Sequence, residues 1–137
     1  MARRASYNDR IIEEFRANGG RVGGWEGTPL LLLTTTGARS GRARTNPLTY
    51  LRDGDRIAIF ASKGGAPTHP DWYYNVRANP RVHVELGDEA FDADARIATG
   101  EERDRIWEEQ KRRNRAFAEY EQKSGREIPV VVLSRSG

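Results

Sequence analysis

The sequence predicts an α+β protein, mainly β, in which a small antiparallel sheet curls into a barrel with helices packed outside. Most of the expected strands are joined by hairpin turns, which are too short for the crossovers of a parallel sheet. Apolar and polar residues alternate in several of these strands, as in a sheet with one covered face. The 137 residues suffice for one packed core and are too few for two. We therefore expect a single barrel.

The first 28 residues are expected to form an N-terminal helix and a flexible connection, ahead of a barrel domain over residues 29–137. A helix over residues 7–17 is predicted because Ile11, Ile12 and Phe15 share one face and Gly19-Gly20 ends the pattern. Pro29 then introduces an apolar strand over residues 30–33, which runs on into three threonines.

Two further strands, over residues 44–52 and 56–62, are predicted on either side of a DGD turn. In the second of them, Ile57 and Ile59 alternate with Ala58 and Phe60, so we expect both of its faces to be covered. Pro70 suits the first turn of a short helix, which Asn79-Pro80 stops.

The last third of the chain contains three strands and one long helix in this prediction. Alternating apolar residues indicate strands near residues 82–86 and 91–97, with Gly87-Asp88 in the turn between them. Thr99 and Glu102 have the spacing of a capping box, which would open a charged helix reaching about Glu121. The terminal "IPVVVLS" is typical of a fully buried strand.

Composition excludes several classes of protein. Hydrophobic residues make up 36% and charged residues 31% of the chain, which is typical of a folded soluble domain. No apolar run approaches the roughly 20 residues that span a bilayer, and no secretory apolar segment follows the N-terminal arginines, so we expect a cytoplasmic protein. With no cysteine and with His69 and His83 in unrelated patterns, no metal site is predicted.

The stretch "TTTGARSGRARTNP" places Arg39, Arg42 and Arg44 on one turn without a carboxylate. Gly37 is expected to allow positive φ and a close approach to the backbone. Ser40, the turn amides and the guanidinium groups would then hold a phosphate or a carboxylate. The alternative is a solvated hairpin turn. A nucleotide-binding P-loop or Rossmann turn is not supported, since neither glycine-rich motif is present.

A second cluster, "FASKGGAPTHPDWYYN", brings Ser62 and Lys63 beside glycines and an aromatic helix. Such a loop can bind a planar heterocycle that carries an anionic tail. In the alternative, Trp72 is core and Lys63 is solvated. Two anion-binding loops in one barrel imply a ligand long enough to touch both. The last predicted helix could roof this pocket or lie loosely on the barrel, with one face formed by Ile106, Gln110, Asn114 and Phe117 and with Tyr120 near its end.

The region from "LLLLTTTGARSGRARTNPL" to "PRVHVEL" resembles the deazaflavin (coenzyme F420)-dependent nitroreductase family. The specific features are TTTGxxSGxxRxNPL, ASKGG, PxWYxN and NP at this spacing, and the likeness runs from about Pro29 to the terminal "IPVVV". The resemblance implies a small antiparallel split β-barrel with helices packed outside. It also implies hydride transfer from reduced F420 to an electron-poor small molecule: a quinone, a nitroaromatic or an activated alkene.

Positions that match the family's motifs imply the site residues. A phosphodiester and an oligoglutamate tail make F420 a polyanion, which the arginine turn would hold. Ser62, or the amide beside it, would hydrogen-bond the developing oxyanion. Cofactor binding is implied for Ala38, Arg39, Ser40, Arg44, Thr45, Asn46, Pro47, Leu48, Thr49, Phe60, Ala61, Ser62, Lys63, Asp71, Trp72, Tyr73, Tyr74 and Asn75.

The implied acceptor site consists of Thr49, Asn114, Phe117 and Tyr120. It departs from the family pattern, because Thr49 replaces a tyrosine and the helix keeps only its last tyrosine. Acceptor specificity therefore stays open.

Other functions remain open at this point. A non-catalytic F420 carrier would keep the same loops, whereas the shorter FMN would leave arginines without a partner. A nucleic-acid module is not expected, because the basic excess sits on one turn. The arginines of the first helix region would tolerate an anionic inner membrane face, but Asp9, Glu13 and Glu14 oppose it, so weak peripheral contact is left open. The sequence does not give the oligomeric state.

Overall fold

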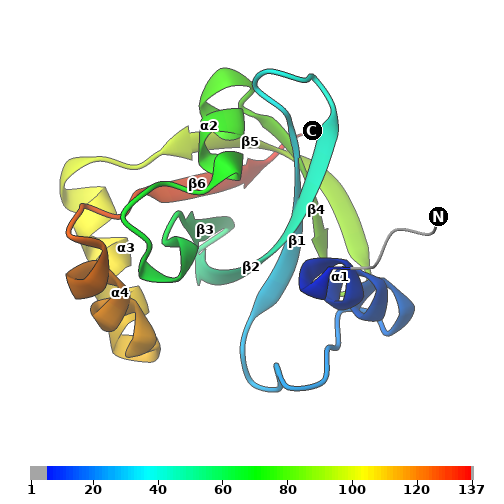
Figure 1. Ribbon diagram of the computed structural model, residues 1–137, viewed down its shortest axis with the longest axis horizontal. Coiled ribbons are helices and arrows are strands. Elements are labelled where there is room, and N and C mark those ends of the chain that lie inside the picture. The colour runs from blue at the N-terminus through cyan, green and yellow to red at the C-terminus, as the bar shows by residue number, and fades with distance from the viewer. Residues whose placement is uncertain (1–5, 137) are drawn as a thin grey trace.

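The computed structural model describes residues 6–136, so Arg3 and Arg4 lie outside the described part of the chain. Figure 1 shows a barrel with helices on its outside. The elements in chain order are α1 (Tyr7–Ala17), β1 (Leu30–Thr36), β2 (Ala43–Asp53), β3 (Arg56–Phe60), the 3-10 helix η1 (Lys63–Gly65), α2 (Asp71–Ala78), β4 (Arg81–Leu86), β5 (Glu89–Ile97), α3 (Gly100–Arg113), α4 (Ala116–Ser124) and β6 (Val130–Arg135).

The strands close into a barrel in the order β1-β2-β3-β6-β5-β4, with antiparallel pairing throughout. The predicted fold class is confirmed. Ile57 and Ile59 of β3 face the barrel interior, while Ala58 and Phe60 pack against the helices outside. The prediction that both faces of this strand are covered is therefore also confirmed.

Each helix covers a different part of the barrel. Trp72 and Val76 of α2 join the interior cluster, and Ile11 and Phe15 of α1 pack on the outward-facing leucines of β1. The α3–α4 pair covers β3 and β6, where the Phe60 ring lies 5.5 Å from that of Phe117. In Figure 1 this pair and α1 lie on opposite sides of the strands.

A bidentate ion pair fixes α1 to the barrel. Arg16 donates from Nε and Nη2 to the carboxylate of Glu85 on β4, at 2.9 and 2.8 Å. This hydrogen bond lowers the pKa of Glu85 from its ordinary value. The division of the chain into residues 1–28 and 29–137 remains a prediction, but in the described residues α1 packs directly on the barrel.

Three sequence predictions about local structure are wrong. The strand over residues 56–62 ends at Phe60. The capping box is absent, because Thr99 caps α3 without a side-chain hydrogen bond and Glu102 accepts two bonds from Arg96 instead. The long helix is split into α3 and α4 at Asn114, whose side-chain oxygen accepts the Ala116 amide and so starts a new helix.

No helix within residues 6–136 is long and apolar enough to cross a membrane. Peripheral membrane contact and a cytoplasmic location stay predictions.

Candidate functional site

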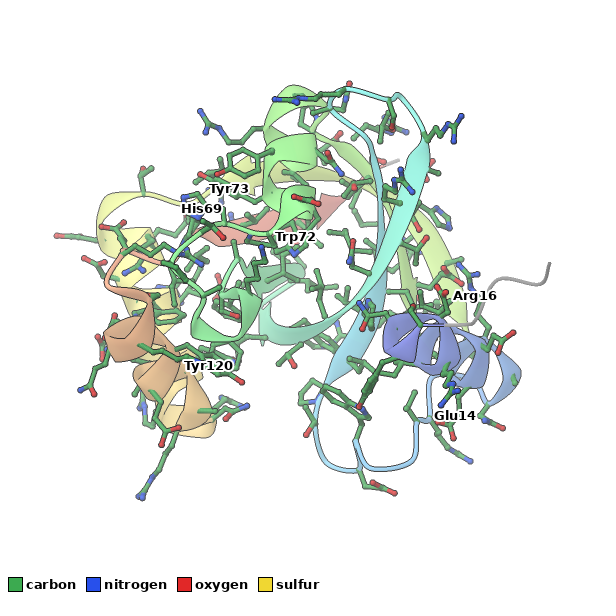
Figure 2. All side chains as sticks on the ribbon, in the orientation of Figure 1. Glu14, Arg16, His69, Trp72, Tyr73 and Tyr120 are labelled. Carbon is green, nitrogen blue, oxygen red and sulfur yellow. The ribbon has the colours of Figure 1, made fainter. Side chains whose placement is uncertain are left out.

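Two clefts meet along β2 and at the start of α2. The first, the arginine cleft, has a volume of about 1150 Å³. The second, the aromatic cleft, has a volume of about 630 Å³ and is lined by residues that include Phe60, Phe117 and Tyr120. Both clefts are lined by Asn46 and Trp72, so together they form one elongated site. Figure 2 shows Trp72 projecting from α2 toward the central strands.

The arginine turn is tight and closed by its own hydrogen bonds. The amide of Gly37 donates to the carbonyl of Arg42 at 2.8 Å, and that of Gly41 donates back to Gly37 at 3.0 Å. Gly41, not Gly37, has the positive φ, so that expectation was wrong. Gly37 is instead closely approached: an added Cβ would lie 2.5 Å from Ser40 Oγ, so that hydroxyl would have to move, and 3.3 Å from the Arg42 carbonyl.

A buried amide on α2 positions this turn. Asn75 Oδ1 accepts the Ala38 amide at 2.9 Å, and its Nδ2 donates to Thr35 Oγ1 at 3.1 Å. Only 8% of Asn75 is exposed. Because both ends of the side-chain amide are engaged, Asn75 contributes to the site by holding the turn against β1.

The charge of the arginine cleft comes mainly from two guanidinium groups. Arg39 and Arg44 line the cleft, whereas Arg42 does not. Within residues 6–136, none of these three arginines makes an ion pair. Arg16 also lines the cleft, but Glu85 already binds its guanidinium. Two carboxylates, Asp9 and Asp71, also line this cleft, so its lining is not uniformly basic.

The aromatic cleft combines an apolar wall with a few polar groups. Phe60 closes it from β3, and the rings of Phe117 and Tyr120 lie 5.1 Å apart on α4. Ser62 and Lys63 enter it from the loop that follows β3. Ser62 makes no capping hydrogen bond through its side chain, so its hydroxyl is available to a ligand.

The structure brings nearly all of the predicted site residues together. The arginine cleft contains Ala38, Arg39, Ser40, Arg44, Thr45, Asn46, Asp71, Trp72, Tyr74 and Asn75. The aromatic cleft contains Asn46, Pro47, Leu48, Thr49, Phe60, Ser62, Lys63, Trp72, Asn114, Phe117 and Tyr120.

Two residues that were predicted to bind the cofactor, and two on the helix face for which a pocket was left open, line neither cleft. Ala61 is fully buried and its amide donates to Pro129, and Tyr73 belongs to the barrel core. Ile106 and Gln110 belong to α3 and are buried, so the part of the predicted helix that faces a pocket is limited to Asn114, Phe117 and Tyr120.

Sequence reasoning missed the contribution of the first 28 residues. Tyr7 and Asn8 of α1 and Trp25 of the connection line the aromatic cleft, and Asp9 and Ile12 line the arginine cleft. Trp25 could have indicated this contribution, because a large aromatic residue in a glycine-rich connection is expected to pack against another part of the protein.

Sequence reasoning also missed Arg126, which follows α4. Its Nη1 donates to His69 Nδ1 at 2.9 Å, and a guanidinium can only donate, so His69 Nδ1 is the acceptor and His69 is neutral. Burial and the nearby charges of Arg126 and Arg77 lower the pKa of His69 below its ordinary value. His69 also packs on Tyr73, with ring centroids 4.7 Å apart, and the two lie side by side in Figure 2.

Acid is expected to destabilise the protein through His69. The unfolded chain binds a proton at this residue near about pH 6.5, whereas the folded chain does so only at lower pH. The unfolded state therefore holds more protons below about pH 6.5, so the free energy of unfolding falls as the pH drops from about 6.5 through the lowered pKa of the folded state. Urea unfolding of the wild type and of His69→Gln, which keeps an acceptor but does not titrate, measures the effect.

The matched control for this prediction is His83→Gln. His83 lies on the outside of the barrel, where its Nδ1 contacts Asp92 at 2.9 Å. The acid-induced loss should persist in this variant and shrink in His69→Gln. Parallel pH profiles for the wild type and His69→Gln would contradict the prediction.

Within residues 6–136, no cluster of three or more His, Cys, Asp or Glu side chains could hold a metal ion. The two clefts offer hydrogen-bond donors, the charges of Arg39, Arg44 and Lys63, and aromatic walls.

Comparisons with known proteins point to one family. The family model described as F420H(2)-dependent quinone reductase matches residues 8–135. The chain is 41% identical over 126 residues to the F420H(2)-dependent quinone reductase of Mycobacterium tuberculosis strain H37Rv. That match covers 88% of this chain and 85% of the relative.

Solved structures agree with this result. The F420-H2 dependent reductase FDR-A is 45% identical, with a TM-score of 0.71 over 77% of this chain and 94% of that one. A structure described as a domain-swapped dimer is 41% identical, with a TM-score of 0.73 over 91% and 96% of the two chains. The heme storage protein HutZ from Vibrio cholerae shares the fold alone, at 16% identity and a TM-score of 0.63 over 94% of this chain and 90% of that one.

Proposed function

The chain belongs to the F420H(2)-dependent quinone reductase family, and from this premise we propose that it binds reduced F420 in the joined clefts and reduces a quinone-type small molecule. One observation carries the proposal. Two arginines without ion pairs in the described residues line a cleft that runs into a second, aromatic-walled cleft. A long ligand with an anionic tail and a flat ring fits this pairing of charge and shape.

The residues present fit the two halves of the cofactor. Arg39, Arg44 and the turn amides would hold its phosphodiester and glutamate carboxylates, because charge-assisted bonds to oxyanions are strong. The flat ring would lie in the aromatic cleft beside Trp72 and Ser62. When bound, reduced F420 supplies a hydride from C5 of its deazaflavin ring.

The acceptor would occupy the outer part of the aromatic cleft. Thr49, Asn114, Phe117 and Tyr120 are the proposed contacts, joined by Tyr7 and Trp25 from the N-terminal segment. The aromatic rings among them would exclude water from the reacting atoms, which strengthens every hydrogen bond made there. Ser62 Oγ would donate to the oxygen of the quinone as negative charge develops on it.

Ser62→Ala is expected to lower kcat by about 100- to 1000-fold with little change in F420 affinity. The reason is that one donor to a developing oxyanion contributes to the transition state and not to cofactor binding. Steady-state kinetics and fluorescence titration with F420 measure the two quantities. Ser134→Ala on β6, which lines neither cleft, is the control. Equal turnover in Ser62→Ala and the wild type would remove Ser62 from the mechanism.

The test of the function is anaerobic oxidation of reduced F420 by a panel of acceptors, followed by deazaflavin absorbance. A menadione-type quinone should be reduced, with reduced FMN and NADPH as control donors. A non-catalytic carrier would bind F420 and show no turnover. Turnover with reduced FMN at the same efficiency would favour the FMN alternative. Nitroaromatic and activated-alkene acceptors belong in the same panel, because acceptor range is a separate prediction.

A further inference from the structure

The loop of residues 61–69, which carries Ser62 and Lys63, has an unusual backbone. Lys63, Gly64 and Gly65 have consecutive φ values of 48°, 62° and 87°. Within residues 6–136, Lys63 is the only non-glycine residue with positive φ. Side chains with a Cβ rarely adopt this conformation, and it persists only where the surroundings hold it. The loop therefore needs an external support.

Arg126 supplies that support from the other end of the chain. Its Nη2 donates to the carbonyls of Ala61 and Ser62, both at 3.1 Å, ahead of the left-handed turn. Its Nε donates to Ala66 and its Nη2 to Thr68, both at 3.0 Å, beyond the turn. With the bond to His69, one guanidinium ties together the two ends of the loop.

We propose that Arg126 is a positioning residue of the proposed reaction: by holding both sides of the left-handed turn, it fixes Ser62 and Lys63 at the aromatic cleft. Arg126 itself lines neither cleft. This inference rests on the proposed function. It deepens that function by naming a side chain outside the site on which the geometry inside it depends.

The geometry requires a guanidinium and not only a positive charge. Three nitrogens in a rigid plane reach five acceptors spread over nine residues of chain. A lysine ammonium is a point charge on a flexible stem and cannot span the same set. Arg126→Lys should therefore behave like Arg126→Ala at the loop.

The experiment compares Arg126→Lys and Arg126→Ala with the wild type. The matched control is Arg105→Ala, because Arg105 is also bidentate, to Asp53 at 3.0 and 3.0 Å, but lines neither cleft and does not contact the loop. The first readout, amide hydrogen exchange, needs no turnover. Amides of residues 61–69 should exchange at least about tenfold faster in both Arg126 variants, with the barrel strands unchanged. Arg105→Ala should match the wild type.

The second readout separates positioning from folding. Both variants should lose about 100-fold in kcat, because a displacement of about 1 Å near the reacting atoms has this effect. The isotope effect with a C5-deuterated donor should rise as hydride transfer becomes rate-limiting. F420 affinity should change by less than about threefold, since the arginine cleft holds the tail. Guanidinium ion should partly restore turnover in Arg126→Ala.

Unchanged exchange in residues 61–69 would overturn the proposal. A second outcome would also overturn it: if kcat, F420 affinity and melting temperature all fell together in the Arg126 variants, the role of Arg126 would be purely structural. If the wild type oxidises no reduced F420 with any acceptor, the proposed function fails, and the exchange data alone then decide whether Arg126 holds the loop.

Discussion

Replacing Arg39 and Arg44 together with alanine should weaken F420 binding by at least about 100-fold. Each charge-assisted hydrogen bond contributes about 1.5–3 kcal/mol, so the loss of two corresponds to at least about 3 kcal/mol. Neither guanidinium makes an ion pair in residues 6–136. Removing them therefore leaves no carboxylate unpaired there, and folding should be little affected. Fluorescence titration with F420 at low and high salt measures the change.

Arg42→Ala is the matched control, because Arg42 is on the same turn but does not line the arginine cleft. This variant should bind F420 within about threefold of the wild type, apart from a small effect of net charge that salt screens. A form of the cofactor without phosphate and glutamates should bind weakly to every variant and show no further loss in the double variant. Equal losses in Arg42→Ala and in Arg39→Ala or Arg44→Ala would mean that only bulk charge matters.

Much of the barrel could be predicted from local sequence. Ile57 and Ile59 alternate with Ala58 and Phe60, and this period of two is enough to place β3 between two apolar layers. The DGD turn fixes its pairing with β2, where Asp53 lies opposite Arg56. Strands that are defined by their own apolar pattern and by an adjacent turn were therefore predictable.

The parts that failed depend on contacts between distant residues. Asn75 holds the arginine turn 37 positions away, and Arg126 holds a loop about 60 positions away. No local pattern reports either contact. At Glu102 a local pattern gave a wrong prediction. Its spacing from Thr99 suits a capping box, but its carboxylate accepts two hydrogen bonds from Arg96 on the neighbouring strand instead. The family motif carries the cleft residues, including Asn75, but it reports neither the contact by which Asn75 holds the turn nor the role of Arg126.

The contact between the end of α1 and the β4–β5 turn should be sensitive to a single methyl group. Gly20 has φ +96°, and an added Cβ would lie 2.8 Å from Cα of Gly87. The atoms that the added methyl group would meet are all backbone atoms of Gly87, so no side chain can move aside. Gly20→Ala should lower the free energy of unfolding by about 2–4 kcal/mol, from backbone strain and overpacking together. Urea unfolding, and a fall of roughly 10 °C in melting temperature, would measure it.

Gly19→Ala separates the clash from the backbone strain. Gly19 also has positive φ, at +61°, but nothing lies within 4 Å of an added Cβ. This variant should lose only the strain of a left-handed alanine, about 1 kcal/mol. Since α1 carries Tyr7, Asn8, Asp9, Ile12 and Arg16 onto the two clefts, Gly20→Ala should also weaken F420 binding, and Gly19→Ala should not. Gly19 and Gly20 look alike in the sequence but differ here in φ and in what surrounds them. Equal losses of stability in the two variants would show that the approach to Gly87 is not tight.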